Sequence, residues 1–429
     1  MSAVVVFIIF AICLVIAIPI SISLGIVAVL PGAFDASFTA SAGYVIRSMV
    51  GGIDSFPLLA VPMFVLAGIL MAHGKISEKL FDVFVYFLGN KRAGIPCAVI
   101  ITCLFYGAIS GSAPATVAAV GSMTIPLLIE LGYEKDFSTA IVAVAGGLGV
   151  IIPPSIPFIM YAMATGESVS DLFLAGIVPG MMISALLIFY AYYYCRRHGE
   201  DREKIQAKMG QLKAKGFFNI LKESIWALLS PVIVLGCIYS GVASPTEAAV
   251  ISVFYSLFVS LFIYKSIKVK QIWGIMVEAM KTYAPILFIL ATSTAFSRVL
   301  TLMQVPQDVS AWIMTHFSNE IVLLLVINVV LLIVGMVMDT TPAILILSPI
   351  LLPIVEHVGM NPIHFGVMMI VNLAVGFVTP PVGVNLFVAS SLTNVPMMQI
   401  AKKAMTMIGY FMLALLLITF IPAISLCLL

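Results

Sequence analysis

Two short polar tips interrupt long apolar runs, and each places several oxygen atoms in a row. The first tip is Ser110-Gly111-Ser112 and the second is Asp339-Thr340-Thr341, and a Pro-Ala pair follows each one. Where helices end at membrane depth, their first N–H groups carry partial positive charge and their last carbonyls offer oxygen ligands. These tips therefore favour binding of a small hard cation such as sodium beside an anionic substrate.

Each half of the chain also carries a Pro-Pro break within an apolar run. Gly149 precedes Pro153-Pro154, and Gly376 precedes Pro380-Pro381. Each Pro removes a backbone donor, and freed backbone groups at membrane depth persist only where protein or a wet cavity satisfies them. We expect the tips and breaks together to hold sodium through the following residues: Ser110, Gly111, Ser112, Gly149 and Ser155 in the first half, and Asp339, Thr340, Thr341, Gly376 and Thr379 in the second. Alternatively, each Ser or Thr hydroxyl has only a structural role and donates a hydrogen bond to a carbonyl of the preceding helical turn.

A few ionisable residues fall within apolar runs, where a charge is costly and therefore suggests function. Arg298 could hold a substrate carboxylate through two hydrogen bonds, or form a structural ion pair or reach the interface. Asp339 could bind a cation or a substrate hydroxyl, or cap a helix. Glu247 follows Ser244-Pro245, so capping alone explains it, although substrate binding stays open. Together with Ser110 and Ser112, these three residues make up the predicted substrate set.

Two amides flank the second break, Asn372 before it and Asn385 after it. We expect them to orient its carbonyls.

Composition indicates an integral membrane protein. Of the 429 residues, 62% are hydrophobic and 9% are charged, against roughly 25% charged in soluble domains. The net charge of +2 suggests no nucleic-acid partner. The six cysteines are scattered, and we find no zinc-protease, ATP-binding or serine-hydrolase motif, so we expect no enzyme activity.

The two halves of the chain repeat each other. Gly107 and Pro114-Ala115 recur as Gly335 and Pro342-Ala343, and the Pro-Pro breaks recur at a nearly constant offset of 227 or 228 positions. We expect a first repeat over 1–195, a basic cytoplasmic linker over 196–222 and a second repeat over 223–429. Each repeat holds a re-entrant hairpin and a broken helix: about 93–131 and 137–165 in the first, and about 320–357 and 362–392 in the second.

Charge orients the repeats. Lys91-Arg92 and Glu134-Lys135 border the first hairpin, whereas neither Lys nor Arg borders the second. Short basic loops stay in the cytoplasm, so the hairpins enter from opposite sides and the repeats have inverted topology. Further spans are expected near 3–31, bent at Pro19, and 55–73, 171–195, 224–240, 245–264, 283–303 and 397–427. Segments 33–50 and 265–282 read as interfacial helices.

Five stretches together resemble the large membrane subunit of tripartite ATP-independent periplasmic (TRAP) transporters, the DctM-like family. They are SGSAPAT (110–116), GGLGVIIPPSIP (146–157), GVASPTEAA (241–249), MDTTPA (338–343) and NLAVGFVTPPVGVNLFVA (372–389). They occur in family order over nearly the whole chain, and the overall run is most similar to the sialic-acid branch.

The resemblance implies an ATP-independent, sodium-coupled importer in a bacterial inner membrane that works by an elevator mechanism. It implies a substrate with a carboxylate, N-acetylneuraminate first and C4-dicarboxylate next. It also implies two partner proteins: a small four-helix membrane subunit, expected as a separate chain, and a periplasmic binding protein that delivers the substrate. Three alternatives stay open: a stand-alone sodium/carboxylate symporter with similar hairpins, a channel and an intramembrane enzyme.

Overall fold

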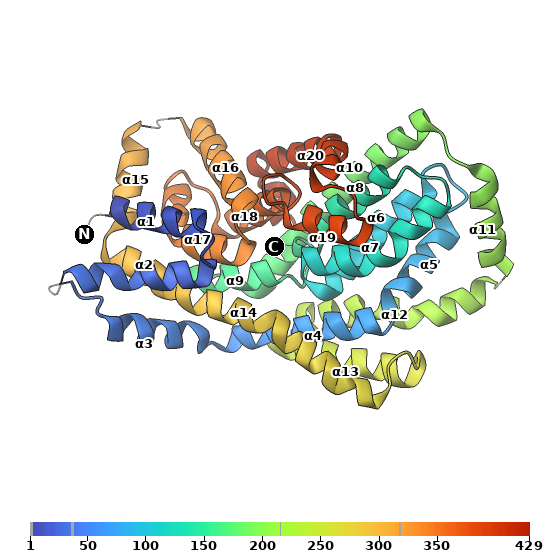
Figure 1. Cartoon of the computed structure of the whole chain (residues 1–429), viewed down its shortest axis with the longest axis horizontal. Helices are drawn as coiled ribbons and strands as arrows, with labels where there is room; N and C mark the ends of the chain where they lie inside the picture. Colours follow the sequence, from blue (N-terminus) through green and yellow to red (C-terminus); the bar gives the residue numbers. More distant parts are fainter. Residues whose placement is uncertain (1–2, 36–37, 215, 317–318) are drawn as a thin grey trace.

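The protein is helical throughout the residues that its computed structural model describes, which are 3–35, 38–214, 216–316 and 319–429. No strand occurs in these ranges. Nine of the described helices are long and apolar enough to cross a membrane. The predicted all-α polytopic membrane fold is therefore confirmed (Figure 1).

The first half starts with a series of helices that precede its hairpin. These are α1 (Ala3–Val15), α2 (Ile20–Phe34), α3 (Ala42–Ile53), the short η1 (Phe56–Leu59), α4 (Ala60–His73) and α5 (Ile76–Leu88). The bend predicted at Pro19 is the gap between α1 and α2. Residues 36–37 of the predicted interfacial segment lie outside the described residues.

The first hairpin and broken helix have nearly the predicted bounds. The hairpin is α6 (Gly94–Ser110) and α7 (Ala113–Glu130), and the broken helix is α8 (Lys135–Ala145), the 3₁₀ turn η2 (Gly146–Val150) and α9 (Ile156–Thr165). Clustered glycines and Pro153-Pro154 explain why the α-helix stops at Ala145. The long α10 (Val169–His198) follows.

The polar stretch between the halves is largely helical rather than an open connector. α10 continues to His198, α11 spans Arg202–Ala214 and α12 spans Phe217–Tyr239. Residue 215 of the predicted linker lies outside the described residues. Two phenylalanines, Phe217 and Phe218, start α12 seven residues earlier than expected.

The second half repeats this order of elements. It contains α13 (Pro245–Phe258), the π-turn η3 (Val259–Ile263), α14 (Val269–Leu302) and α15 (Val305–His316). The second hairpin, α16 (Glu320–Val337) and α17 (Thr340–His357), comes next. The second broken helix is α18 (Pro362–Gly376) and α19 (Val384–Thr393), and α20 (Met397–Phe420) and α21 (Ala423–Leu426) end the chain.

The expectation of a separate interfacial helix at 265–282 is wrong. The structure continues one α-helix from Val269 through Pro285 to Leu302. Pro285 lies inside this helix, and no glycine pair or capping residue near Pro285 ends the helix there. α14 therefore runs along the molecule and packs against α2, α3, α4 and α17 (Figure 1).

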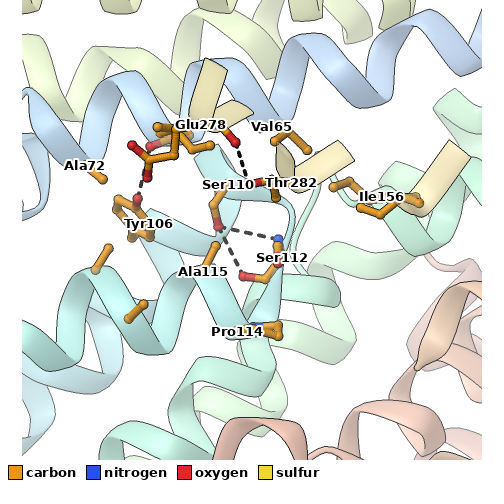
Figure 2. Close-up of a pocket in the computed structure, with 15 residues that line it drawn as sticks. Val65, Ala72, Tyr106, Ser110, Ser112, Pro114, Ala115, Ile156, Glu278 and Thr282 are labelled. Atoms are coloured by element: carbon orange, nitrogen blue, oxygen red, sulfur yellow. Dashed lines mark hydrogen bonds between the residues drawn. The ribbon is translucent and has the colours of Figure 1, made fainter. Parts of the chain in front are cut away.

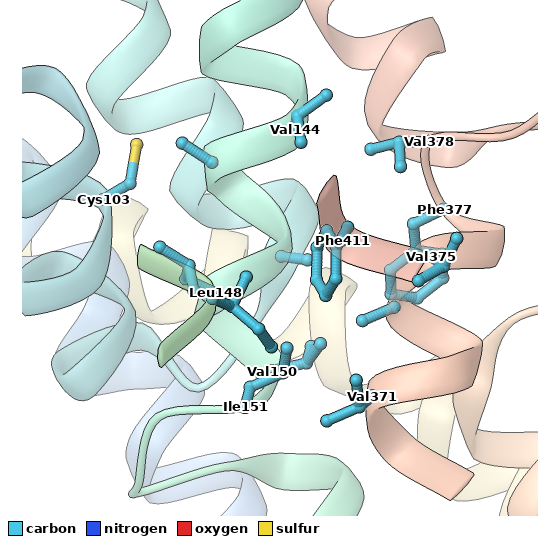
Figure 3. Packing of buried hydrophobic residues seen from close by; sticks show 14 of the residues in the cluster. Cys103, Val144, Leu148, Val150, Ile151, Val371, Val375, Phe377, Val378 and Phe411 are labelled. Carbon is cyan, nitrogen blue, oxygen red and sulfur yellow. The ribbon is translucent and has the colours of Figure 1, made fainter. Parts of the chain in front are cut away.

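The largest buried cluster includes apolar side chains of both broken helices. Figure 3 shows apolar side chains of both breaks meeting around Phe411 of α20. The labelled residues of this cluster are Cys103, Val144, Leu148, Val150, Ile151, Val371, Val375, Phe377, Val378 and Phe411. This core places both breaks beside each other at the centre of the protein.

Candidate functional site

The first tip folds its oxygens into one turn between α6 and α7. Ser110 Oγ lies 3.0 Å from Thr116 Oγ1 and donates to the Ser112 carbonyl at 3.3 Å. Thr116 Oγ1 donates to the same carbonyl at 2.8 Å. Gly111 has a φ of +60°, a left-handed conformation in which glycine commonly ends a helix. The tip thus gathers hydroxyl and carbonyl oxygens of Ser110, Ser112 and Thr116 within one turn.

The first break is hydrogen-bonded to the first tip. The Ile156 N–H donates to the Gly111 carbonyl at 3.3 Å, and Ser155 Oγ donates to the Val150 carbonyl at 2.6 Å. A Cβ added to Gly149 would lie 2.8 Å from the Ser112 carbonyl oxygen, so glycine is needed for this approach. The predicted residues of the first half therefore do come together.

The second tip begins α17 with an acidic cap. Asp339 Oδ1 accepts from the Thr340 N–H at 2.7 Å and from the Thr340 hydroxyl at 3.4 Å. Both Thr340 and Thr341 are buried. A carboxylate at a helix N-terminus is stabilised by the helix dipole. Asp339 thus caps α17, as one reading of the sequence expected, and its other oxygen remains a candidate ligand.

The second break lies directly against the second hairpin. The Val382 N–H donates to the Met336 carbonyl at 3.2 Å, and a Cβ on Gly376 would lie 2.4 Å from the Gly335 carbonyl carbon. Thr379 Oγ1 donates to the Val375 carbonyl at 2.7 Å, which is the local bond expected of a helix hydroxyl. Its lone pairs remain available to a cation.

Both tips meet in one small cavity, called here the tip cavity, of about 70 Å³. The first half contributes the tip, the break and the start of α9, the second half contributes the second tip and break, and α14 closes it. Its lining residues are Gly111, Ser112, Pro114, Val150, Ile156, Pro157, Ile286, Asp339, Thr340, Thr341 and Phe377. Segments more than 200 residues apart thus build a single site.

A larger cavity of about 470 Å³, called here the inner cavity, shares Ser112, Pro114, Ile156 and Ile286 with the tip cavity. Figure 2 shows Ser110 and Ser112 on its wall, near Thr282 and Glu278 of α14. Tyr106 also lines it and donates its hydroxyl to the Gly68 carbonyl at 3.2 Å. This cavity has room for a small organic anion beside the tips.

The predicted substrate residues Arg298 and Glu247 lie away from the tips. Arg298 is exposed and lines a separate cavity of about 380 Å³ with Ser297, Thr301 and residues of α3, α9 and α17. This Arg298 cavity shares no lining residue with the tip cavity or the inner cavity. Glu247 completes a capping box, accepting from the Ser244 N–H at 2.8 Å on the exposed start of α13.

The donor set fits a hard monovalent cation. Within the described ranges no group of three His, Cys, Asp or Glu side chains could hold a metal. Carbonyl and hydroxyl oxygens and the single carboxylate of Asp339 are the ligands available around the tip cavity, and hard cations bind oxygen ligands.

Sequence reasoning missed the contribution of α14 to these cavities. Glu278, Thr282 and Ile286 line them, but they fell in or beside the segment expected at the interface. The apolar residues around Pro285 gave no sign in the sequence that a cavity lies there. Only the continuous helix reveals that these residues face the tips.

A family profile described as "Tripartite ATP-independent periplasmic transporter, DctM component" matches residues 7–424. The chain is 39% identical to the C4-dicarboxylate TRAP transporter large permease protein DctM of Pseudomonas aeruginosa over 87% of this chain and 86% of that protein. It is 37% identical to the 2,3-diketo-L-gulonate TRAP transporter large permease protein YiaN of Escherichia coli, covering 81% and 80%.

It is also 43% identical to the isethionate TRAP transporter permease protein DctMQ of Oleidesulfovibrio alaskensis, over 97% of this chain. The matched part spans 64% of that relative's length. Among solved structures, the YdaH transporter of Alcanivorax borkumensis matches with a TM-score of 0.62 at 13% identity, over 93% of this chain and 96% of that one. This last likeness concerns the fold alone.

Proposed function

Because the chain belongs to the DctM component family of TRAP transporters, a family of transport proteins rather than enzymes, we propose a specific transport cycle for it. It imports a carboxylate-bearing organic anion together with sodium, by an elevator mechanism, in a bacterial inner membrane. The observation that carries this proposal is the tip cavity, where both tips and both breaks converge.

Sodium binds at two places in this proposal. The first uses oxygens of Ser110, Gly111 and Ser112 with the break from Gly149 to Ser155. The second uses Asp339, Thr340 and Thr341 with the break from Gly376 to Thr379. The fixed carbonyl geometry around Gly149 supports the first, and the free Asp339 oxygen supports the second. Bound sodium ions neutralise the carbonyl ends and favour an anion nearby.

The substrate occupies the inner cavity beside the tips. The N-terminus of α7 directs its first N–H groups and partial positive charge toward this space, which favours an anionic group. Ser110 and Ser112 stand on the same wall and can donate to it. The neighbouring Asp339 in the tip cavity is the residue proposed to accept from a substrate hydroxyl.

Arg298 binds the anion at a different stage of the transport cycle from Ser110 and Ser112. It lies twelve residues beyond Ile286 on α14, which corresponds to roughly 18 Å along a helix. An elevator motion of the hairpins along α14 brings the tips from the level of Ile286 toward Arg298. In that position Arg298 holds the substrate carboxylate on the outer side.

Inverted topology of the halves 1–195 and 223–429 underlies this motion. Matching elements, helix–tip–helix and then helix–break–helix, occur in the same order in both. The charged borders of the first hairpin and the uncharged borders of the second support opposite orientations. The stretch 196–222 then stays in the cytoplasm.

The proposed partners are a small four-helix membrane subunit and a periplasmic binding protein. The relatives described above are named as TRAP permeases, and one carries the combined name DctMQ. A stand-alone symporter is not favoured, because the matched relatives are components of such systems. Glu247 is exposed on α13 and caps that helix. A contact between Glu247 and the substrate is a secondary part of the proposal, because capping already explains its position.

The substrate is proposed as a small organic anion. The relatives described above are named for a C4-dicarboxylate, isethionate and 2,3-diketo-L-gulonate, all acids. None of these three is named for N-acetylneuraminate, so that compound rests on overall sequence resemblance alone. A screen should include all four.

Uptake into liposomes tests the proposal. The chain is reconstituted with its small subunit and binding protein, and each labelled anion is offered with an inward sodium gradient or with choline in place of sodium. Accumulation of the anion in the sodium condition, and none in the choline condition, supports the proposal. Equal accumulation in choline would overturn sodium coupling, and uptake without the binding protein would favour the stand-alone symporter.

A further inference from the structure

Asn385 connects the two broken helices by hydrogen bonds. It lies in the first turn of α19, directly after the second break, and is fully buried. Its backbone N–H donates to the Phe377 carbonyl at 3.0 Å. Its side-chain Nδ2 donates to the Ala143 carbonyl in α8 at 3.1 Å. One residue of the second half thus fixes a carbonyl in each half.

Both partners of Asn385 lead to the tip cavity. Phe377 lines that cavity itself. Ala143 lies in the last turn of α8, where the helix gives way to the 3₁₀ turn that ends at Val150, another lining residue. Carbonyls near such a helix end lose their regular partners, and the Asn385 amide supplies one. Asn385 does not line the cavity itself, but it hydrogen-bonds to the segment of each half that leads to the cavity wall.

The surroundings of this link are apolar. Asn385 and Ala143 are both fully buried, and apolar side chains of both breaks lie close to one another in Figure 3. In such low dielectric a hydrogen bond is stronger than in water, and a carbonyl without a partner is costly. A shift of one break relative to the other that broke this bond would therefore be costly.

The fold itself does not require an amide at this position. The residue at the matching position of the first repeat, 227 earlier, is Phe158, which is also fully buried. The Asn385 Oδ1 has no hydrogen-bond partner among the described protein groups, and an unsatisfied buried oxygen destabilises the protein. An apolar side chain would avoid this cost, so the amide is there for the bond to Ala143.

We propose that Asn385 is a positioning residue that couples the two sodium sites. Binding at one break then sets the position of the carbonyls at the other, and the two ions bind cooperatively. This inference rests on the two-site sodium binding proposed above. It adds a named link between sites that lie in different halves of the chain.

Direct binding of radioactive sodium tests this coupling. Purified full-length protein with its small subunit is placed in nanodiscs, and ²²Na⁺ is titrated at constant ionic strength with choline as the replacement ion. The wild-type curve should have a Hill coefficient above 1. Asn385→Ala and the volume-matched Asn385→Leu should each bring it to about 1, with sodium still bound at high concentration.

Asn372→Ala is the matched control, because this buried amide flanks the same break but bonds only within the second half, to the Asn328 carbonyl and Oδ1 at 2.9 and 2.8 Å. It should keep a Hill coefficient above 1. A non-cooperative wild type, or Asn385 variants as cooperative as the wild type, would overturn the coupling while leaving sodium binding intact. A wild type that binds no sodium would overturn the proposed function itself.

Discussion

Gly107 of the first hairpin lies against Gly149 of the first break so closely that a Cβ on Gly107 would be 2.7 Å from the Gly149 Cα. In the second half Gly335 and Gly376 meet in the same way, and a Cβ on Gly376 would be 2.6 Å from the Gly335 Cα. These four residues occupy matching positions of the two repeats. Each hairpin is thus held on its break by a backbone contact that only glycine permits.

Gly107→Ala should destabilise the protein and abolish most transport. The added methyl group meets backbone rather than a flexible side chain, and overpacking of this kind costs about 1–3 kcal/mol. Thermal unfolding of the purified protein checks the stability effect. Gly409→Ala in α20 is the control, since a Cβ there meets nothing within 4 Å; an equal loss in both variants would show that the contact is unimportant.

Thr341→Ala should weaken sodium binding more than it lowers the maximal rate. The residue is buried at the tip cavity. Loss of one oxygen ligand is expected to raise the half-saturating sodium concentration about 2- to 12-fold, because a polar contact contributes about 0.5–1.5 kcal/mol. Uptake at varied sodium and saturating substrate measures it. Ser122→Ala on the exposed side of α7 is the hydroxyl control, and identical curves for both variants would remove Thr341 from the site.

Arg298→Ala should raise the KM for the anion by about 10- to 100-fold, since hydrogen bonds to charged groups contribute about 1.5–3 kcal/mol. Arg298→Lys should restore only part of the affinity, because an ammonium cannot make the paired contacts of a guanidinium. Arg47→Ala, on the exposed side of α3, should leave KM unchanged. If Arg298→Ala has the wild-type KM at every sodium concentration, Arg298 does not contact the substrate.

The base of the first hairpin should lose stability in acid through Glu134. Hydrogen bonds from Lys403 and then Tyr194 hold the pKa of this carboxyl below its ordinary value of 4.5. A lowered pKa in the folded state means that the stabilisation is complete above pH 4.5 and is lost as the pH falls below it. Glu134→Gln should therefore flatten the pH dependence of the unfolding temperature between pH 5 and about 3. Wild-type and variant curves that fall in parallel would contradict this role.

The sequence predicts both hairpins and both breaks because their signals are local. Gly and Pro stop helices wherever they occur, so Pro153 and Pro380 mark the breaks within a few residues of their observed bounds. Repetition of Gly107 as Gly335 adds a second, independent signal. The hairpins and the breaks can therefore be predicted without knowledge of tertiary contacts.

The arrangement around the site depends on packing and could not be predicted in this way. Arg298 was expected beside the tips, but the unbroken α14 carries it to a separate cavity and brings Glu278 and Ile286 near the tips instead. The amphipathic α5 and α15 were also missed, because charges such as Glu78 and Asp308 interrupt their apolar runs. Their buried faces become evident only beside neighbouring helices.

Entry of ²²Na⁺ into liposomes, recorded together with the labelled anion, shows directly whether anion import is coupled to sodium. The complex with its partners is used, with no sodium gradient imposed at the start. Anion addition should drive sodium entry in a fixed ratio to anion uptake, and Thr341→Ala should reduce both. Anion accumulation without any sodium entry would contradict the account, whatever the effect of the variant.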